Sequence, residues 1–371
     1  MTRASPVLRD RIFRAYWEFA AERHRIFERR LAGEPPPWTD DPILANYRFC
    51  NAFRASDRVS QGLIRNAAYG GPSSAEDVFL RVALYRLFSR PSTWDLLETR
   101  VGPITASDFR AEQYGKVLDS AFSKGETLYT AAFILAPSSV YGFARKHRNH
   151  LALLEAMLAD GLPDRVAASE SLEAVYWELR KWPMLGPFMA YQLAIDLNYS
   201  TILDHSEDEF TVPGPGAIRG LKKVFAETRG WKPHELVRWL QDQRGMVGDE
   251  MGIEPPTLLG RPLQLIDCQN LLCEVDKYSR VAFPELSSSR SRIKQTFEPD
   301  PEPLRLFYPP KWSLEVPPDA AYGAPRASRP EEPCTGLAVT GGCIPSVAGV
   351  AEHANVQSVC LGGRQVEQPE L

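Results

Sequence analysis

The chain is poor in cysteine and has no long apolar run. Its 371 residues include six cysteines, none of which forms a Cys-x-x-Cys pair with another. This spacing excludes a disulfide framework and disfavours a structural zinc site, so we expect no protein-bound metal. No apolar stretch approaches the roughly 20 residues that span a bilayer, and the N-terminus lacks the apolar core of a signal peptide. We therefore expect a soluble, intracellular protein without membrane partners, nuclear if its source is eukaryotic.

A large charge excess of one sign is also missing, as is a nucleotide-binding loop. The formal net charge is −4, so any nucleic-acid contact has to come from a local basic face. The P-loop pattern, in which two glycines precede Lys and Ser or Thr, does not occur in the sequence. The chain is therefore not expected to bind ATP in the usual way, and a kinase reaction would require a separate P-loop protein.

Helical periodicity dominates the first 316 residues. Apolar side chains recur at intervals of three and four in the ranges 7–31, 76–88, 110–122, 150–158, 171–181, 187–198, 217–226, 233–243 and 264–281. Strand-like alternation is scarce, which predicts a mostly α fold in a single helical domain spanning residues 1–316. Residues 317–371 are rich in Pro, Gly, Ala, Ser and Val without a sustained period, which predicts a disordered tail.

A tight Pro/Gly turn joins two of the predicted helices. Pro183 ends the first helix, because proline removes a backbone donor and clashes with the preceding turn. Gly186 precedes Pro187, which suits the first position of the second helix. The backbone N–H groups that begin this helix have no intrahelical partner and are suited to phosphate binding.

This stretch resembles the helix-hairpin-helix motif of the DNA-glycosylase superfamily, whose turn reads Leu-Pro-Gly-hydrophobic-Gly. Met184 stands where the family has its first glycine, and Ala190 stands where bifunctional members carry a lysine. A Schiff-base lyase mechanism is therefore not implied. The catalytic carboxylate of the family falls on the run Glu207, Asp208, Glu209, in which Asp208 is the best match. The alternative for this run is a solvated loop that caps the following helix.

Four ordered blocks carry a narrower resemblance: Asp41 to Ile64, the hairpin region, Pro213 to Leu221 and Leu265 to Arg280. Together they resemble the helical domain of 5-hydroxymethyluracil (5-hmdU) DNA kinases. That domain is related to the proposed α-glutamyl/putrescinyl-thymine pyrophosphorylases of DNA hypermodification, and both are regarded as derivatives of the glycosylase fold. The resemblance implies a DNA-glycosylase-like helical domain that works on a modified thymine base in DNA.

Candidate binding residues follow Pro42, in a segment that we expect to be helical. Polar side chains recur there at steps of three and four and predict one continuous polar face for phosphate and base contacts: Tyr47, Asn51, Arg54, Arg58 and Gln61. Phe49, Phe53 and Ile64 lie opposite and suit a core. The alternative for the polar set is a solvated helix face.

Further candidates come from the hairpin and the last two blocks. Gly186, Gly214 and Gly216 permit close backbone approach to a phosphate, and Arg219 is placed to bind one. Glycines that only make a sharp turn are the alternative. Glu274 and Lys277 match the family block, although an ordinary helix-surface ion pair has the same spacing.

The leading hypothesis is a DNA-base-modifying transferase. It would transfer a group at the 5-hydroxymethyl carbon of 5-hydroxymethyluracil or of a pyrophosphorylated thymine. In this hypothesis Asp208 activates the nucleophile, the arginines neutralise phosphates, and Glu274 with Lys277 completes the pocket. No cofactor is assigned, although Mg²⁺ suits a phosphorylated base. Two alternatives stay open: a DNA glycosylase that excises a modified base, and a non-catalytic DNA-binding module that works with a separate kinase.

Overall fold

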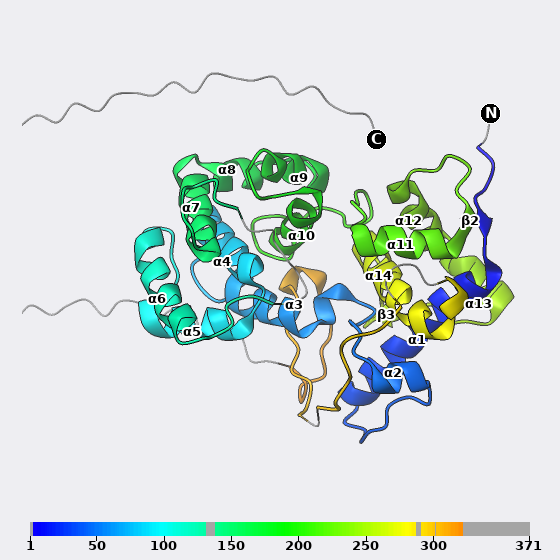
Figure 1. The fold of residues 1–371 in the computed structure, drawn as a ribbon. Coiled ribbons are helices and arrows are strands. Elements are labelled where there is room, and N and C mark those ends of the chain that lie inside the picture. Colours follow the sequence, from blue (N-terminus) through cyan, green and yellow to red (C-terminus); the bar gives the residue numbers. More distant parts are fainter. Residues whose placement is uncertain (1–2, 131–137, 287–290, 301, 322–371) are drawn as a thin grey trace, which may run out of the picture. The chain divides into compact units, whose positions relative to one another are not determined.

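The computed structural model describes residues 3–130, 138–286, 291–300 and 302–321. Helices dominate these residues, so the predicted mostly α fold is confirmed. The helices are α1 Asp10–Leu31, α2 Pro42–Asn46, α3 Arg58–Gly62, α4 Ala75–Phe88, α5 Pro91–Val101, α6 Ala111–Ser123, α7 Lys146–Ala159, α8 Leu162–Ala167, α9 Leu172–Arg180, α10 Pro187–Asn198, α11 Pro215–Val224, α12 Pro233–Asp242, α13 Arg244–Met251 and α14 Leu265–Ala282 (Figure 1). None of the described helices is long and apolar enough to cross a bilayer.

The strands of the described residues are short and form two antiparallel pairs next to the ends of helices. β1 (Val7–Leu8) pairs antiparallel with β2 (Phe225–Glu227), and β3 (Thr257–Leu258) pairs antiparallel with β4 (Arg261–Pro262). The first pair joins the start of α1 to the end of α11. The second pair leads directly into α14.

The predicted pair of helices around Pro183 is present as α9 and α10, which pack against each other. Met184 adopts a left-handed backbone conformation, with φ of 66°, in the connecting turn. Glycine takes this conformation most readily, and glycine is the residue of the family pattern here. Gly186 caps α10 from an extended conformation. Phosphate binding by this turn remains a prediction.

Helix α10 lies in the interior of the protein. All of its residues from Met189 to Asn198 are buried, and the helix packs against α9 and α4 (Figure 1). A helix that is buried on every side should be apolar, yet α10 carries Gln192 and Asp196. These two polar side chains therefore require partners inside the protein.

Asp196 obtains its partners from two arginines that are distant in the sequence. Its carboxylate accepts hydrogen bonds from Arg54, at 2.7 Å, and from two guanidinium nitrogens of Arg86 on α4, one of them at 2.8 Å. Arg54 also donates to Gln192 Oε1 at 3.1 Å. The side chains of Arg54 and Asp196 are 2% and 0% exposed. This network fixes the segment around Arg54 to α10 and α4.

Two glycines on α11 allow it to lie directly on α14. A Cβ at Gly216 would stand 2.2 Å from Cys273 Sγ, and a Cβ at Gly220 would stand 2.1 Å from the backbone oxygen of Leu272. Neither distance is compatible with a side chain. The structure thus gives both glycines a packing role, which differs from the sharp turn expected as the alternative, and phosphate contact by Gly216 remains a prediction.

The predicted continuous helix after Pro42 is wrong. α2 ends at Asn46 and α3 begins at Arg58, and the intervening backbone contains only a 3-10 turn at Arg54–Ser56. Tyr47 forms an antiparallel bridge with Thr296, so a tertiary pairing replaces helix propagation. The predicted polar set is therefore spread over several elements. The apolar positions of the same segment are buried as expected: Phe49, Phe53 and Ile64.

Residues 302–321 pack against the helical part of the protein. Leu306 N donates to Ala320 O at 2.8 Å, and the Leu306, Tyr308 and Ala320 side chains are buried. Residues 317–321 thus include a turn packed on the protein, whereas residues 322–371 lie outside the described residues. The boundary at residue 316 and the disordered tail remain predictions.

The Asp196→Asn variant tests the buried network. It should destabilise the protein by about 3–5 kcal/mol, because Arg54 and Arg86 would be left buried without their counter-charge. Urea unfolding of the full chain at pH 7 measures this loss. The matched control is Asp160→Asn, which removes an ion pair with Arg165. The Asp160 side chain is 55% exposed, so this variant should lose less than about 1 kcal/mol of stability. Equal losses in the two variants would contradict a stabilising role for the network.

Close packing of α11 on α14 predicts a strong effect of Gly220→Ala. The added methyl group would force the helices apart and should lower the free energy of unfolding by roughly 1–3 kcal/mol. Gly245→Ala on α13 is the control, since a Cβ there meets no atom within 4 Å and alanine favours the helix. Thermal unfolding that ranks Gly220→Ala at or above Gly245→Ala would disprove the close contact.

Candidate functional site

A loop of residues 49–57 is fixed to α14 by two carboxylates. Cys50 N donates to Glu274 Oε2 at 3.0 Å, and Arg54 N donates to Asp267 Oδ1 at 2.8 Å. Glu274 and Asp267 are seven residues apart and so lie on one face of the helix. The loop needs these partners because its non-helical backbone leaves N–H groups free. It separates two polar clusters.

The first cluster surrounds Glu274. Lys277 Nζ lies 2.6 Å from Glu274 Oε2 and 4.5 Å from the centroid of the Phe49 ring. Across the loop, Asn51 N donates to Asp57 Oδ1 at 2.8 Å. Burial raises the pKa of Asp57 to about 6. A carboxyl group with this pKa exchanges a proton near neutral pH, as acid–base catalysis requires.

Arg23 of α1 joins this cluster. Burial lowers the pKa of its guanidinium, and the charges of Asp57 and Glu274 act in the opposite direction. Its NH1 atom is buried and has no hydrogen-bond partner within the part of the chain that the structure describes. A buried donor without an acceptor is costly, so this atom is suited to a ligand that supplies one.

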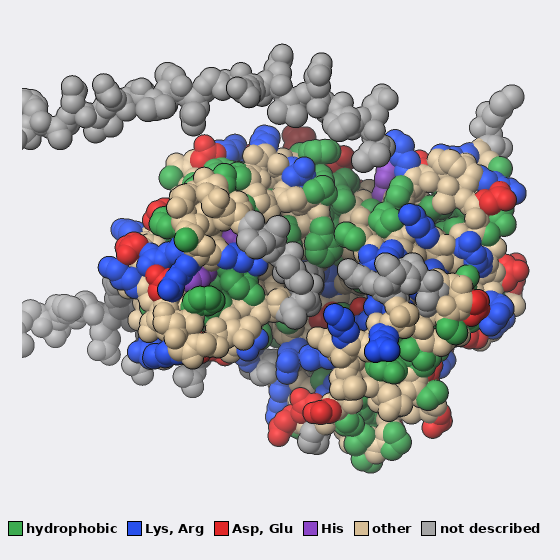
Figure 2. All heavy atoms as spheres, in the orientation of Figure 1, with side chains coloured by type: hydrophobic (Ala, Val, Ile, Leu, Met, Phe, Trp, Pro, Cys, Tyr) green, Lys and Arg blue, Asp and Glu red, His purple; other side chains and the backbone are tan. Residues whose placement is uncertain are grey.

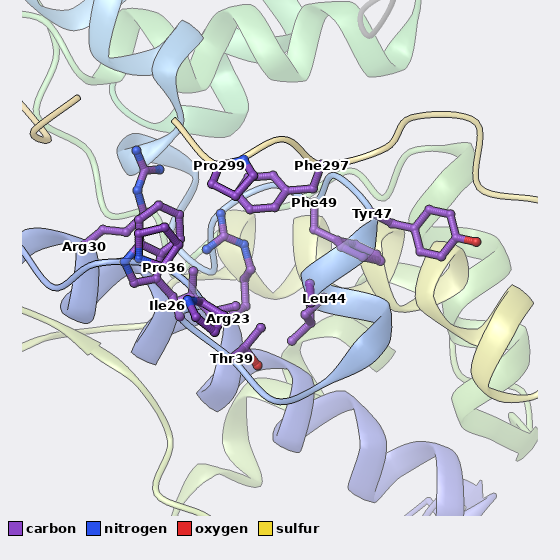
Figure 3. Close-up of a pocket in the computed structure, with 13 residues that line it drawn as sticks. Arg23, Ile26, Arg30, Pro36, Thr39, Leu44, Tyr47, Phe49, Phe297 and Pro299 are labelled. Atoms are coloured by element: carbon purple, nitrogen blue, oxygen red, sulfur yellow. The ribbon is translucent and has the colours of Figure 1, made fainter. Parts of the chain in front are cut away.

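A pocket of about 60 Å³ adjoins Arg23 and Phe49. Aromatic and proline side chains provide most of its wall, with two arginines among them: Arg23, Ile26, Arg30, Pro36, Pro37, Trp38, Thr39, Leu44, Ala45, Tyr47, Phe49, Phe297 and Pro299. In Figure 3 the guanidinium groups of Arg23 and Arg30 point toward the segment that carries Phe297 and Pro299, while the Tyr47 ring points away from the other side chains. The pocket and the Glu274 cluster therefore share Arg23 and border on Phe49.

The second cluster lies beyond Arg54 and contains two buried carboxyl groups. Burial raises the pKa of Glu207 to about 7 and the pKa of Asp267 to about 6. Glu207 pairs with Arg261 at 3.2 Å, and the Arg261 guanidinium lies 4.1 Å from the centroid of the Trp312 ring. Lys311 binds the backbone oxygens of Asn198, Ser200 and Leu203. The segment 302–321 therefore covers this cluster.

The structure brings together only part of the predicted site. Asn51 lies in the 49–57 loop, and Glu274 and Lys277 lie next to this loop on α14. Tyr47 lines the adjoining pocket. Arg58 is exposed and available to a phosphate. Two residues instead hold the protein together: Arg54 in the Asp196 network, and Gln61, which donates to Ala55 O and accepts from Phe307 N.

Asp208 is held away from Glu274 and Lys277. Its carboxylate accepts a hydrogen bond from Gln241, and Arg238 donates to its backbone oxygen at 2.6 Å. No described contact joins Asp208 to Lys277. The catalytic role of Asp208 remains a prediction, although its neighbour Glu207 is the carboxyl group of the run that enters the buried cluster.

Arg219, on α11, pairs with a carboxylate on a different face of α14 from Glu274. Its Nε atom is 3.1 Å from Asp276 Oδ2, and the same carboxylate group pairs with Lys223 and Arg280. Burial alone would raise the pKa of Asp276, but these cations outweigh it and lower the pKa. The remaining glycine of this block, Gly214, stands where a Cβ would lie 2.6 Å from Phe188. The predicted convergence of Asp208 and Arg219 on one cleft with Lys277 is therefore absent from the described residues.

Sequence patterns did not identify four titratable groups of the site. Arg23 lies within the long first helix, whose many charged residues do not distinguish it, and Asp57 has no family match. Asp267 lies in the block of the last helix without a role in the resemblance, and Glu207 matches the family carboxylate less well than Asp208. The sequence does contain one signal: Asp267 and Glu274 are seven residues apart, a spacing that places two side chains on the same face of a helix.

The described residues hold no evident metal centre, and the face drawn in Figure 2 has no single large basic patch. Among the described residues, no group of three or more His, Cys, Asp and Glu side chains is arranged to hold a metal ion. On the face that Figure 2 draws, Lys and Arg side chains are distributed with Asp and Glu among them.

Comparison with known proteins identifies related sequences. The family model described as the helical domain of 5-hmdU DNA kinase matches residues 10–288. The chain is 26% identical over 298 residues to the 5-hmdU DNA kinase of Bacillus phage SP10, an alignment that covers 74% of this chain and 46% of the relative. The chain thus spans about half the length of that relative. No solved structure matches the chain.

Glu207→Gln tests the buried carboxyl group through pH. Between about pH 4.5 and pH 7 the unfolded chain ionises Glu207 while the folded protein keeps it protonated, so wild-type stability falls as pH rises. The variant lacks this loss. Its stability relative to wild type should therefore increase from pH 5 to pH 8, on the order of 2 kcal/mol by urea unfolding. Exposed Glu209→Gln is the control, and an equal difference at both pH values for Glu207→Gln would rule out the raised pKa.

Proposed function

Because the chain belongs to the family of 5-hmdU DNA kinase helical domains, we propose that it modifies 5-hydroxymethyluracil, or a phosphorylated form of this base, in DNA. The observation that carries the proposal is the meeting of Asp57, Glu274 and Lys277 beside an aromatic pocket. These groups supply a proton acceptor, a positioning carboxylate and a cation. Together they suit the transfer of a group at the 5-hydroxymethyl substituent.

The target base has to leave the duplex before it reaches these groups. A base within the stack exposes only its edges, so an enzyme that acts on its substituent flips it out or takes it from a single strand. Arg58 is exposed at the start of α3, close in sequence to Asp57, and is suited to hold a phosphate of the flanking strand. The hairpin at Met184 to Pro187 offers the backbone N–H groups predicted to contact a second phosphate.

The proposed step is a displacement at the 5-methylene carbon of a base that already carries a phosphate or pyrophosphate. A nucleophile forms a bond to this carbon and passes its proton to the Asp57 carboxylate. The bond from carbon to the phosphate oxygen breaks, and the leaving group departs with the electron pair. Lys277 neutralises this developing charge, and Glu274 holds Lys277 in place at 2.6 Å.

Phosphorylation of the base would come from a P-loop protein or segment outside these 371 residues. The second candidate function follows from the same division of labour. As the helical part of a 5-hmdU DNA kinase family, the chain would hold the hydroxymethyl group for such a kinase, and Asp57 would accept the hydroxyl proton. In both functions the substrate is DNA and the reacting atom lies beside Asp57.

Lys277→Met tests the proposed transfer. The variant and wild type are incubated with 5-hydroxymethyluracil DNA and with its pyrophosphorylated form, together with candidate nucleophiles, and the digested nucleosides are analysed by mass spectrometry. The variant should form the base adduct at least about 100-fold more slowly, because it lacks the cation that stabilises the leaving group. Lys116→Met is the control, since it also removes a helical Lys–Glu pair, at an exposed site.

Three outcomes separate the candidate functions. An adduct that depends on Lys277 supports displacement, and a phosphorylated base formed only with an added P-loop kinase supports presentation. An abasic product that is lost in Asp208→Asn and retained in Lys277→Met would replace both with a glycosylase centred on Asp208.

A further inference from the structure

We infer that the pocket bordered by Phe49 and Phe297 receives the flipped pyrimidine, and that the Arg23 guanidinium donates a hydrogen bond to a carbonyl oxygen of its ring. This inference rests on the proposed function and names the place where the base binds. The ligand of the pocket is thus a pyrimidine nucleotide within a DNA strand.

The walls of the pocket suit a flat aromatic ring. Phe49, Phe297 and Trp38 contribute aromatic surfaces, and Pro36 and Pro299 contribute flat aliphatic ones. Stacking of a base on such surfaces is favourable for any base, so the walls alone give affinity without selectivity. Selectivity requires a polar group within the pocket.

Arg23 provides that polar group. It lines the pocket, and one nitrogen of its guanidinium, NH1, has no hydrogen-bond partner among the described residues. Pyrimidines with two ring carbonyls, such as thymine and uracil derivatives, present acceptors to a donor of this kind. A guanidinium that gains its missing acceptor only when the base is bound distinguishes an occupied pocket from an empty one.

The nearby charges place the reacting substituent next to the proposed catalytic groups. Phe49 lines the pocket and also lies under Lys277, with Nζ 4.5 Å from the ring centroid. Asp57 and Glu274 are close enough to Arg23 for their charges to raise the pKa of its guanidinium. A base bound between Phe49 and Phe297 therefore has its edge close to both the proton acceptor and the cation.

The wall that carries Phe297 is held to the protein by few backbone bonds. Phe297 N donates to Asn46 O at 2.9 Å, and Arg48 N donates to Gln295 O at 3.1 Å. The pocket volume of about 60 Å³ is smaller than the roughly 150 Å³ of a cavity that encloses benzene. The base therefore enters as this segment shifts outward, with its sugar and phosphate outside. Arg30, whose guanidinium lies 5.0 Å from the Trp38 ring centroid, is placed at the pocket for that phosphate.

The test is binding of oligonucleotides that differ at one position: 5-hydroxymethyluracil, thymine, or an abasic analogue. Wild type should bind the DNA with either base more tightly than the abasic DNA, and 5-hydroxymethyluracil more tightly than thymine. Arg23→Met should reduce the advantage of a base over the abasic site by roughly 10-fold. Its affinity for abasic DNA should stay unchanged, because the phosphate contacts remain.

Arg25→Met is the matched control, since Arg25 lies on the same helix, is exposed, and does not line this pocket. Phe297→Ala is a second pocket variant outside the helices, and it too should lose base-dependent affinity. If Arg23→Met and Phe297→Ala both keep the preference of wild type for 5-hydroxymethyluracil, the pocket assignment is wrong. The proposed function is not contradicted by that result. A wild type that does not distinguish 5-hydroxymethyluracil from thymine would overturn the proposed function itself.

Discussion

The buried carboxylate of Asp196 is the interaction on which the arrangement of the rest depends. It lies on a helix that is enclosed on all sides, and it holds Arg54 and Arg86 from two separate parts of the chain. Burying three charged groups is costly unless their hydrogen bonds are made, so this geometry tolerates little displacement. Burial alone would lower the pKa of Arg54, but the Asp196 charge outweighs it and raises the pKa. The loop that contains Arg54 is thereby fixed at one end.

That fixed loop determines where the polar groups of the site meet. Its backbone donates to Asp267 and Glu274, which occupy one face of α14. Two chemically different neighbourhoods result. On the side of Glu274, a lysine, an arginine with an unpartnered nitrogen and an acid of raised pKa adjoin an aromatic pocket. On the side of Asp267, the covering segment around Trp312 shields Glu207.

The helices were largely predictable from the sequence, whereas the loop was not. Apolar periodicity located α4, α10 and α14 within one or two residues, because each helix has its own repeating pattern. The segment after Pro42 also has helical spacing, but hydrogen bonds to distant residues such as Thr296 and Glu274 prevail over local propensity. The glycines of α11 looked like a phosphate-binding turn because close helix packing and close ligand approach both require a missing side chain. The close approach of Gly216 to Cys273 shows the packing, which the sequence could not distinguish from ligand approach.

Photo-crosslinking tests most directly whether the target base binds in the pocket bordered by Phe49 and Phe297, next to the 49–57 loop. DNA with 5-iodouracil at the target position is irradiated in complex with the full chain, and the attached peptide is identified by mass spectrometry. Attachment to Phe49 or Phe297 is the predicted result, because both side chains line the pocket beside Lys277. Attachment confined to the hairpin around Met184, or to the loop around Asp208, would contradict the claim and move the base to a different part of the protein.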